Sequence, residues 1–346
     1  MSPVFIVSIF IIIRLAQQQD SKSEKLTFVS ANAIFFKIMA DSNLEQFKQN
    51  PSRFLEKAIK DYVTGSSFNR LSAFAHDPIF DQPLVGFADG DDEIFQEYKN
   101  RKIIGDFHLT PREALEKYIQ QTDSVNNRML TNISVISYVL PIACKTRLSL
   151  RKETQVTSVR WNHTRWQGQN LIDELSRYLV SLLENLGCRA VAPEQSDFFK
   201  RIELSNGLAS NWSQRHIAYA AGLGTFSLSD GFITPKGLAM RCGSIVCDAS
   251  LTPTPRLYKT HLDNCLFYKG IPCQRCAERC PGGAISPKGH NKQKCLDFID
   301  NEQPKLLKKL ERADKGYIGR ALTCGLCQTN VPCESRIPPA PSTQNG

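Results

Sequence analysis

The chain has 346 residues, of which 41% are hydrophobic and 22% are charged. This composition is that of a folded globular protein, and it excludes a disordered or collagen-like chain. The 43 basic and 34 acidic residues give a net charge of +9, but the basic residues are scattered, so charge alone indicates RNA binding only weakly. The length allows two domains.

An apolar run at residues 3–13, "PVFIVSIFIII", ends at Arg14. It is shorter than the roughly 20 residues of a membrane helix, and it lacks the basic start and the cleavage site of a signal peptide. Met39 opens a sequence that would be a sensible start of translation. We therefore expect residues 1–38 to be a leader or disordered segment, with membrane association as the alternative, and the protein to be cytoplasmic.

Helical segments are expected over residues 43–64, with Pro51 at a helix start. Loop-rich sequence follows, up to "LTPREALEKYI", which opens a second helix. There Thr110 and Glu113 have the spacing of a capping box, with a proline at the first helical position. The β-branched run over residues 133–143 predicts a buried strand.

A leucine stripe over residues 169–187 predicts a core helix that ends at a glycine, and "CRAVAP" after it predicts a short strand. The order strand, helix, strand predicts an α/β domain over residues 39–240. Within it, residues 209–237 are expected to form a helix and a glycine-rich turn. Gly222 and Gly224 in this turn do not form a dinucleotide fingerprint, but they would allow close approach of a planar cofactor or a cluster.

Ten of the twelve cysteines lie between residues 242 and 333. Such a block after a large domain indicates metal sites rather than the disulfides of a secreted protein. The stretch "GIPCQRCAERCPGGAI" matches the last three cysteines of the ferredoxin run C-x2-C-x2-C-x3-C-P, with Gly270 in place of the first. A second run, "TCGLCQTNVPCESRIP", follows. Residues 241–338 are thus expected to form a ferredoxin-like domain with two 4Fe–4S clusters, before a disordered tail at 339–346.

In two-cluster ferredoxins the cysteine before the proline ligates the other cluster. Applied here, this rule gives one complete ligand set: Cys280, Cys295, Cys324 and Cys327. The second set is one ligand short: Cys273, Cys276 and Cys333. We expect Cys265 to complete it, with Cys242, Cys247 or a three-cysteine cluster with an open iron as alternatives. Zinc also binds C-x2-C pairs, but it does not need the C-x3-C-P-G-G-A-I tail.

These two cysteine motifs, with "SVISYVLPI" and "AYAAGLGTF", resemble the iron–sulfur proteins related to epoxyqueuosine reductase and, more distantly, the reductive dehalogenases. The resemblance covers most of residues 65–338. It implies a nitroreductase-like α/β domain that holds a base-off cobalamin, next to a ferredoxin-like domain with two 4Fe–4S clusters. It also implies reductive deoxygenation of epoxyqueuosine in tRNA, with an electron donor such as ferredoxin or flavodoxin.

One departure concerns the proton donor. The queuosine enzymes carry an acidic residue before their "AGLG" element, whereas that register here falls on Leu208, which has no carboxylate. Another group must protonate the substrate, or the substrate differs. Five polar or tyrosine side chains set among aromatic residues are the candidate catalytic groups: His163, Arg165, Arg215, His216 and Tyr219.

The leading hypothesis is therefore an oxidoreductase of the epoxyqueuosine reductase type. A reductive dehalogenase-like enzyme, an electron carrier without its own catalytic centre, and an RNA-binding module are the alternatives. The substrate would be tRNA or a small molecule.

Overall fold

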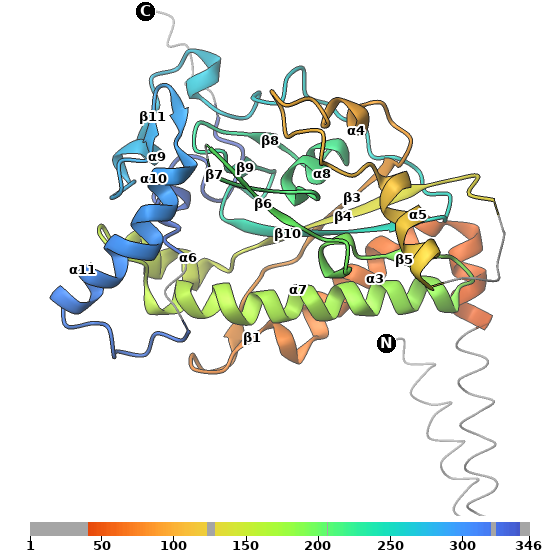
Figure 1. The fold of residues 1–346 in the computed structure, drawn as a ribbon. Coiled ribbons are helices and arrows are strands. Elements are labelled where there is room, and N and C mark those ends of the chain that lie inside the picture. Colours follow the sequence, from red (N-terminus) through yellow and green to blue (C-terminus); the bar gives the residue numbers. More distant parts are fainter. Residues whose placement is uncertain (1–40, 123–128, 206, 320–322, 340–346) are drawn as a thin grey trace, which may run out of the picture. The chain divides into compact units, whose positions relative to one another are not determined.

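The computed structural model describes residues 41–122, 129–205, 207–319 and 323–339 (Figure 1). The chain divides into two units, residues 1–51 and 52–346. In the first unit residues 41–49 are helical. The predicted leader at 1–38 lies outside the described residues, as does the predicted tail except for residue 339. No helix in the described ranges is both long enough and apolar enough to cross a membrane.

The second unit is built around a four-stranded sheet with the order β3-β4-β10-β5. These strands are β3 (Leu84–Asp89), β4 (Ser134–Pro141), β10 (Met240–Cys247) and β5 (Ala190–Val191). All their pairings are antiparallel. Every residue of β4 is buried, as predicted for the run at 133–143. The unit is a mixed α and β fold with an antiparallel sheet.

Strand β10 changes the predicted domain boundary. The boundary at 240 falls on the first residue of β10, which lies between β4 and β5 in the sheet. Residues 240–247 therefore belong to the sheet, and the cysteine-rich part begins after them. Cys242 and Cys247 are strand residues, opposite Val139 and Ser134. Burial raises the pKa of Cys242 to about 11 and that of Cys247 to about 12.

Helices cover both faces of the sheet. The long helix α7 (Val159–Asn185) runs along one face, and α5 (Pro111–Thr122) and α8 (Gln214–Ala220) lie on the other (Figure 1). Helix α7 begins well before the predicted start at 169, because the Ser158 hydroxyl accepts a hydrogen bond from Trp161 N at 3.2 Å and caps it there. Helices α3 (Pro51–Gly65) and α6 (Cys144–Arg151) pack against α7.

The predicted capping box of α5 is present. Thr110 N donates to Glu113 Oε2 at 2.9 Å, and Glu113 N donates to Thr110 Oγ1 at 3.2 Å. Two amide donors that the first turn leaves without helical partners are thereby satisfied, which fixes where the helix starts.

The other elements are short, and those of the cysteine-rich part gather at one end of the unit (Figure 1). The remaining helices are α4 (Ile94–Glu97), α9 (Arg275–Glu278), α10 (Lys292–Asp297) and α11 (Gln303–Lys309). Two-stranded pairs are formed by β1 (Arg70–Leu71) with β2 (Asp77–Pro78), β6 (Arg201–Leu204) with β7 (Gly207–Ser210), β8 (Thr225–Phe226) with β9 (Phe232–Ile233), and β11 (Ile285–Ser286) with β12 (Gly289–His290). Single turns are η1 (Ser67–Asn69), η2 (Pro193–Gln195), η3 (Phe267–Lys269), η4 (Phe298–Glu302) and η5 (Leu326–Gln328).

Candidate functional site

Four thiols from distant parts of the cysteine-rich segment line one small cavity: Cys265, Cys273, Cys276 and Cys333. Most of the other walls are apolar, and they include Leu228, Leu238 and Val331. Burial, and then the neighbouring thiols Cys265 and Cys273, raise the pKa of Cys276 to about 11. Cys265 therefore lies with the three cysteines that lacked a fourth partner in the sequence.

A second group of four consists of Cys280, Cys295, Cys324 and Cys327. Burial, followed by the charges of Cys295 and Cys280, raises the pKa of Cys324 to about 12. The pKa of Cys327 is raised well above its usual value by burial and then by the other three thiols of this group. The amide of Ala284 donates to Cys280 Sγ at 3.3 Å, a backbone contact of the kind that tunes cluster sulfurs.

The donor chemistry fits iron–sulfur clusters. Each group offers four thiols and no disulfide consumes any of them; four thiolates are the ligand set of a 4Fe–4S cluster. Within the described ranges, no three His, Cys, Asp or Glu side chains are close enough to hold a single metal ion. A cube needs a wider arrangement than one tetrahedral ion, because each thiolate binds a different iron. Burial favours neutral thiols, so metal binding has to offset the cost of deprotonating them.

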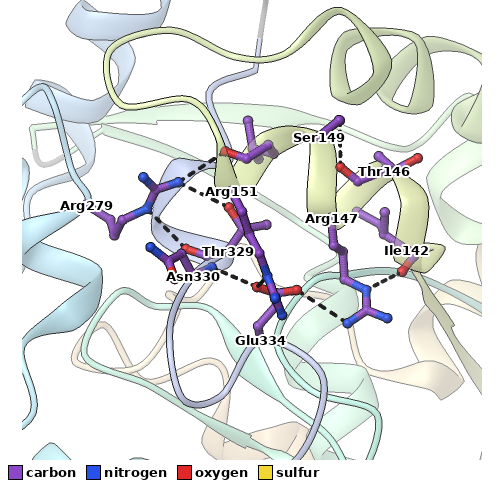
Figure 2. Close-up of polar contacts among 10 residues, drawn as sticks. Ile142, Thr146, Arg147, Ser149, Arg151, Arg279, Thr329, Asn330 and Glu334 are labelled. Carbon is purple, nitrogen blue, oxygen red and sulfur yellow. Dashed lines mark hydrogen bonds and ion pairs between the residues drawn. The ribbon is translucent and has the colours of Figure 1, made fainter.

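The loop that carries Cys333 is attached to helix α6 through Glu334 (Figure 2). The Glu334 carboxylate is buried, with 3% of its side chain exposed. Its Oε2 accepts hydrogen bonds from Arg151 Nε and from Asn330 N, both at 2.7 Å, and its Oε1 accepts one from Arg147 Nη1 at 3.4 Å. Both arginines belong to α6, so one carboxylate joins the cysteine-rich part to the helices around the sheet.

Arg279, beside Cys280, makes a second attachment at the end of the same helix (Figure 2). Its Nη1 donates to Glu153 O at 2.7 Å and its Nη2 to Leu150 O at 3.2 Å. Its Nε donates to Thr329 O at 3.2 Å. The segments around both thiol groups are thus held against α6.

A cleft of about 420 Å³ lies beside the thiol groups. Its volume falls in the range of roughly 300–1,000 Å³ that is usual for small-molecule sites. Leu238 lines both the cleft and the cavity of the first thiol group. Gln328, which also lines the cleft, directly follows Cys327 of the second group. The cleft thus shares a wall residue with the cavity of the first thiol group, and another of its wall residues adjoins a thiol of the second group in the sequence.

Two of the predicted catalytic residues lie at or behind this cleft. Arg215 lines it, and its Nη1 donates to the carbonyl oxygen of Asp230. Arg165 lies behind the lining residue Gln169, to whose Oε1 its Nη1 donates at 3.4 Å. Burial, and then the charge of Arg201, lower the pKa of Arg165.

The other three candidates are not among the lining residues. His163 Nε2 is hydrogen-bonded to Gly316 O at 2.7 Å and holds a loop against α7. His216 Nδ1 is hydrogen-bonded to the Ser213 hydroxyl at 2.8 Å, and burial lowers its pKa to about 3, so the imidazole is neutral at pH 7. Tyr219 packs against an aromatic neighbour, and burial raises its pKa.

The two glycines that we expected at a cofactor allow close backbone packing. A Cβ on Gly224 would lie 2.3 Å from Ile233 O, and one on Gly222, where φ is +72°, would lie 2.7 Å from Pro255 O. Leu208, at the register of the family's acidic residue, is 44% exposed in β7.

Sequence reasoning missed seven polar residues that line the cleft: Gln169, Glu194, Ser210, Ser213, Gln214, Arg241 and Gln328. Glu194 supplies a carboxylate there, from the short turn after β5. Gln328 lies inside a cysteine motif and Arg241 beside a cysteine. Their places in the sequence suggest that they lie near the cysteines, but not that they line a cleft. Nothing in the sequence around Glu194 marks it.

No family model and no curated protein matches the chain. Among solved structures it is similar to a selenomethionine-labelled epoxyqueuosine reductase, with 16% identity and a TM-score of 0.41. It is also similar to epoxyqueuosine reductase from Bacillus subtilis, with 15% identity and a TM-score of 0.38, and to an epoxyqueuosine reductase with a tRNA-Tyr stem loop, with 16% identity and a TM-score of 0.38. Each match covers 83% of this chain and 69% of the other. These three solved structures are epoxyqueuosine reductases, and their identity to this chain is too low to define its reaction.

Proposed function

We propose that this chain is an iron–sulfur oxidoreductase that reduces a substrate bound in the cleft, with electrons supplied by two 4Fe–4S clusters. The observation that carries the proposal is the position of the thiols beside the cleft. Leu238 separates the cleft from one group of four, and Gln328 connects its wall to Cys327 of the other. Such proximity is what transfer of electrons into a bound substrate requires.

The ligands of one cluster would be Cys265, Cys273, Cys276 and Cys333, and those of the other Cys280, Cys295, Cys324 and Cys327. The bound clusters would supply one-electron transfer, and the chain would supply their position and their exclusion from water. Glu334 and Arg279 support this role, since they hold the cluster loops against α6.

For the reaction, we propose reductive deoxygenation of the epoxyqueuosine type, with tRNA as the substrate and a ferredoxin or flavodoxin as electron donor. The cysteine motifs and their sequence resemblance support this choice. Reduction of a carbon–oxygen bond consumes protons, and the sequence lacks the family's acidic residue at Leu208. Glu194 in the cleft is the carboxyl group that could supply a proton in its place.

The sequence resemblance also implies a cobalamin, which would supply a strongly reducing cobalt. A cleft of about 420 Å³ suits a much smaller ligand than a whole cobalamin, so this cleft would enclose only part of one. Cobalt analysis after incubation with cobalamin separates an enzyme that uses this cofactor from one that reduces its substrate directly.

The proposal is tested by anaerobic purification and reconstitution, followed by iron and sulfide analysis and electron paramagnetic resonance. We expect eight irons per chain, as two 4Fe–4S clusters require. Cys265→Ser should lose the signal of one cluster, whereas Cys144→Ser, a change at an exposed thiol outside both groups, should keep both. Zinc instead of iron, or an unchanged spectrum of Cys265→Ser, would contradict the proposed ligands.

Turnover distinguishes the remaining possibilities. An epoxyqueuosine-type enzyme converts the modified nucleoside in a tRNA stem loop under reducing conditions, and a dehalogenase-like enzyme releases halide from an organohalide. A protein with both clusters that reduces neither substrate, but accepts electrons and returns them to a second protein, would be an electron carrier.

A further inference from the structure

The cleft has an excess of positive charge. Arg215 and Arg241 line it, and Arg165 lies directly behind it. Glu194 provides the carboxylate of the lining. Among the described residues, the hydrogen bonds of these three arginines go to amide and carbonyl oxygens rather than to carboxylates.

Neutral acceptors take the place of carboxylates. Arg241 Nη2 donates to Gln169 Oε1 at 2.5 Å, and Arg165 donates to the same oxygen at 3.4 Å. Arg215 donates to the backbone carbonyl of Asp230. The buried Nε of Arg241 has no hydrogen-bond partner in the part of the chain that the structure describes. Two guanidinium groups therefore share one amide oxygen, and one buried donor is unsatisfied.

The nearby carboxylates are engaged with amides instead. Glu194 Oε2 accepts a hydrogen bond from Gln214 Nε2 at 2.9 Å. Asp173 Oδ1 accepts one from Gln169 Nε2 at 2.9 Å. Both carboxylates attract Arg165 and Arg241 from a distance, but neither forms a direct ion pair with these two arginines.

Several half-buried arginines outside the cleft do have a carboxylate partner, whereas Arg279 donates to carbonyl and hydroxyl oxygens. Arg160 pairs with Asp77 at 2.9 Å, Arg189 with Asp248 at 2.8 Å, and Arg312 with Glu153 at 2.8 Å. A guanidinium removed from water without a counter-charge costs free energy, and the repulsion between Arg165 and Arg241 adds to that cost. A negatively charged ligand in the cleft would supply the missing counter-charge and so reduce this free-energy cost.

We propose that the cleft binds the oxyanion group, phosphate or carboxylate, of a small molecule, with Arg215 and Arg241 as its direct contacts. Guanidinium groups match such groups with two parallel hydrogen bonds, and both arginines line the cleft. This inference goes beyond the proposed redox function, because an oxyanion binds these arginines whether or not a cluster is present.

The test is equilibrium binding of inorganic phosphate, and in parallel of acetate, to the full-length protein by isothermal titration calorimetry, before and after cluster reconstitution. Saturable binding of either anion should weaken about tenfold or more in Arg215→Gln and in Arg241→Gln, since each removes a charge-assisted hydrogen bond. Arg101→Gln is the matched control. It removes the same charge from an exposed side chain that pairs with Asp106, and should leave the affinity unchanged.

Two results would overturn the proposal. The first is phosphate and acetate binding that is absent, or equally strong in the Arg215→Gln and Arg101→Gln proteins. Because Arg215 is exposed, its variant reports on the site even if Arg241→Gln does not fold. The second is that both cleft variants bind an RNA stem loop more weakly, while neither phosphate nor acetate competes with the stem loop for the unchanged protein. That result would assign the arginines to contacts with a nucleic-acid backbone. Since iron content is measured separately, loss of the clusters leaves either result interpretable.

Discussion

Replacement of Glu334 by glutamine tests whether a single buried carboxylate holds in place the loop of Cys333, a ligand of one proposed cluster. The change keeps the size of the side chain and one carbonyl oxygen, but removes the charge that faces Arg147 and Arg151. It also leaves an amide group pointing at guanidinium groups that can only donate. Both stability and cluster retention should therefore fall.

The magnitude follows from the contacts. Charge-assisted hydrogen bonds contribute about 1.5–3 kcal/mol each. Arg151 is 43% exposed, so water screens part of its contribution, and the contact of Arg147 is long at 3.4 Å. We expect a loss of about 3 kcal/mol, at the lower end of what breaking a buried pair costs. For a domain of this size, that lowers the melting temperature by about 6–12 °C.

The measurement is thermal unfolding of the anaerobically reconstituted protein, with iron content determined on the same samples. Glu278→Gln is the control, because its exposed carboxylate pairs with Arg275 on a helix of the same cysteine-rich part. The reasoning is refuted if Glu334→Gln melts within about 2 °C of the control and retains all its iron, a difference that corresponds to less than 1 kcal/mol.

Three further predictions concern the α and β part of the second unit. Burial lowers the pKa of His108 to about 4, below its unfolded value near 6.5. The free energy of unfolding should therefore be constant above pH 6.5 and about 2 kcal/mol lower at pH 5. Urea unfolding should show this pH dependence, and His108→Gln should reduce it. Thr110→Ala breaks the capping box of α5 and should reduce the free energy of unfolding by about 1 kcal/mol, whereas an unchanged value would refute the role of the cap. Gly224→Ala forces a methyl group against Ile233 O and should cost about 1–3 kcal/mol in the same assay, with normal stability as the contrary result.

The elements that the sequence predicted well are those with strong local signals. The β-branched run of β4 and the capping box of α5 are each determined by residues close together in the sequence, and both are present. Helix α7 was predicted too short, because its first turns lack the leucine stripe. Those turns pack through Trp161, Asn162 and His163 against loops far along the chain, and local periodicity cannot reveal such contacts.

The candidate site divides in the same way. Cysteine spacing carries information, because short loops must wrap a cluster, and it was enough to suggest two ligand sets. The cleft has no such spacing. Gln169, Glu194 and Arg241 come from a helix, a turn and a strand, and only the folded sheet brings them together. Their neighbours in the sequence give no sign of this.

The place of β10 in the sheet decides how this protein can be dissected. A fragment ending at residue 239 would lose the strand between β4 and β5, and with it the Ser244 hydroxyl that accepts from Trp212 Nε1 at 2.9 Å. Even the segment after β10 is tied to the sheet, since Thr254 N donates to Phe87 O at 2.8 Å. The sheet and the cysteine-rich part therefore cannot be separated by a cut at the start of the cysteine block; a fragment that keeps the sheet intact has to extend beyond Thr254.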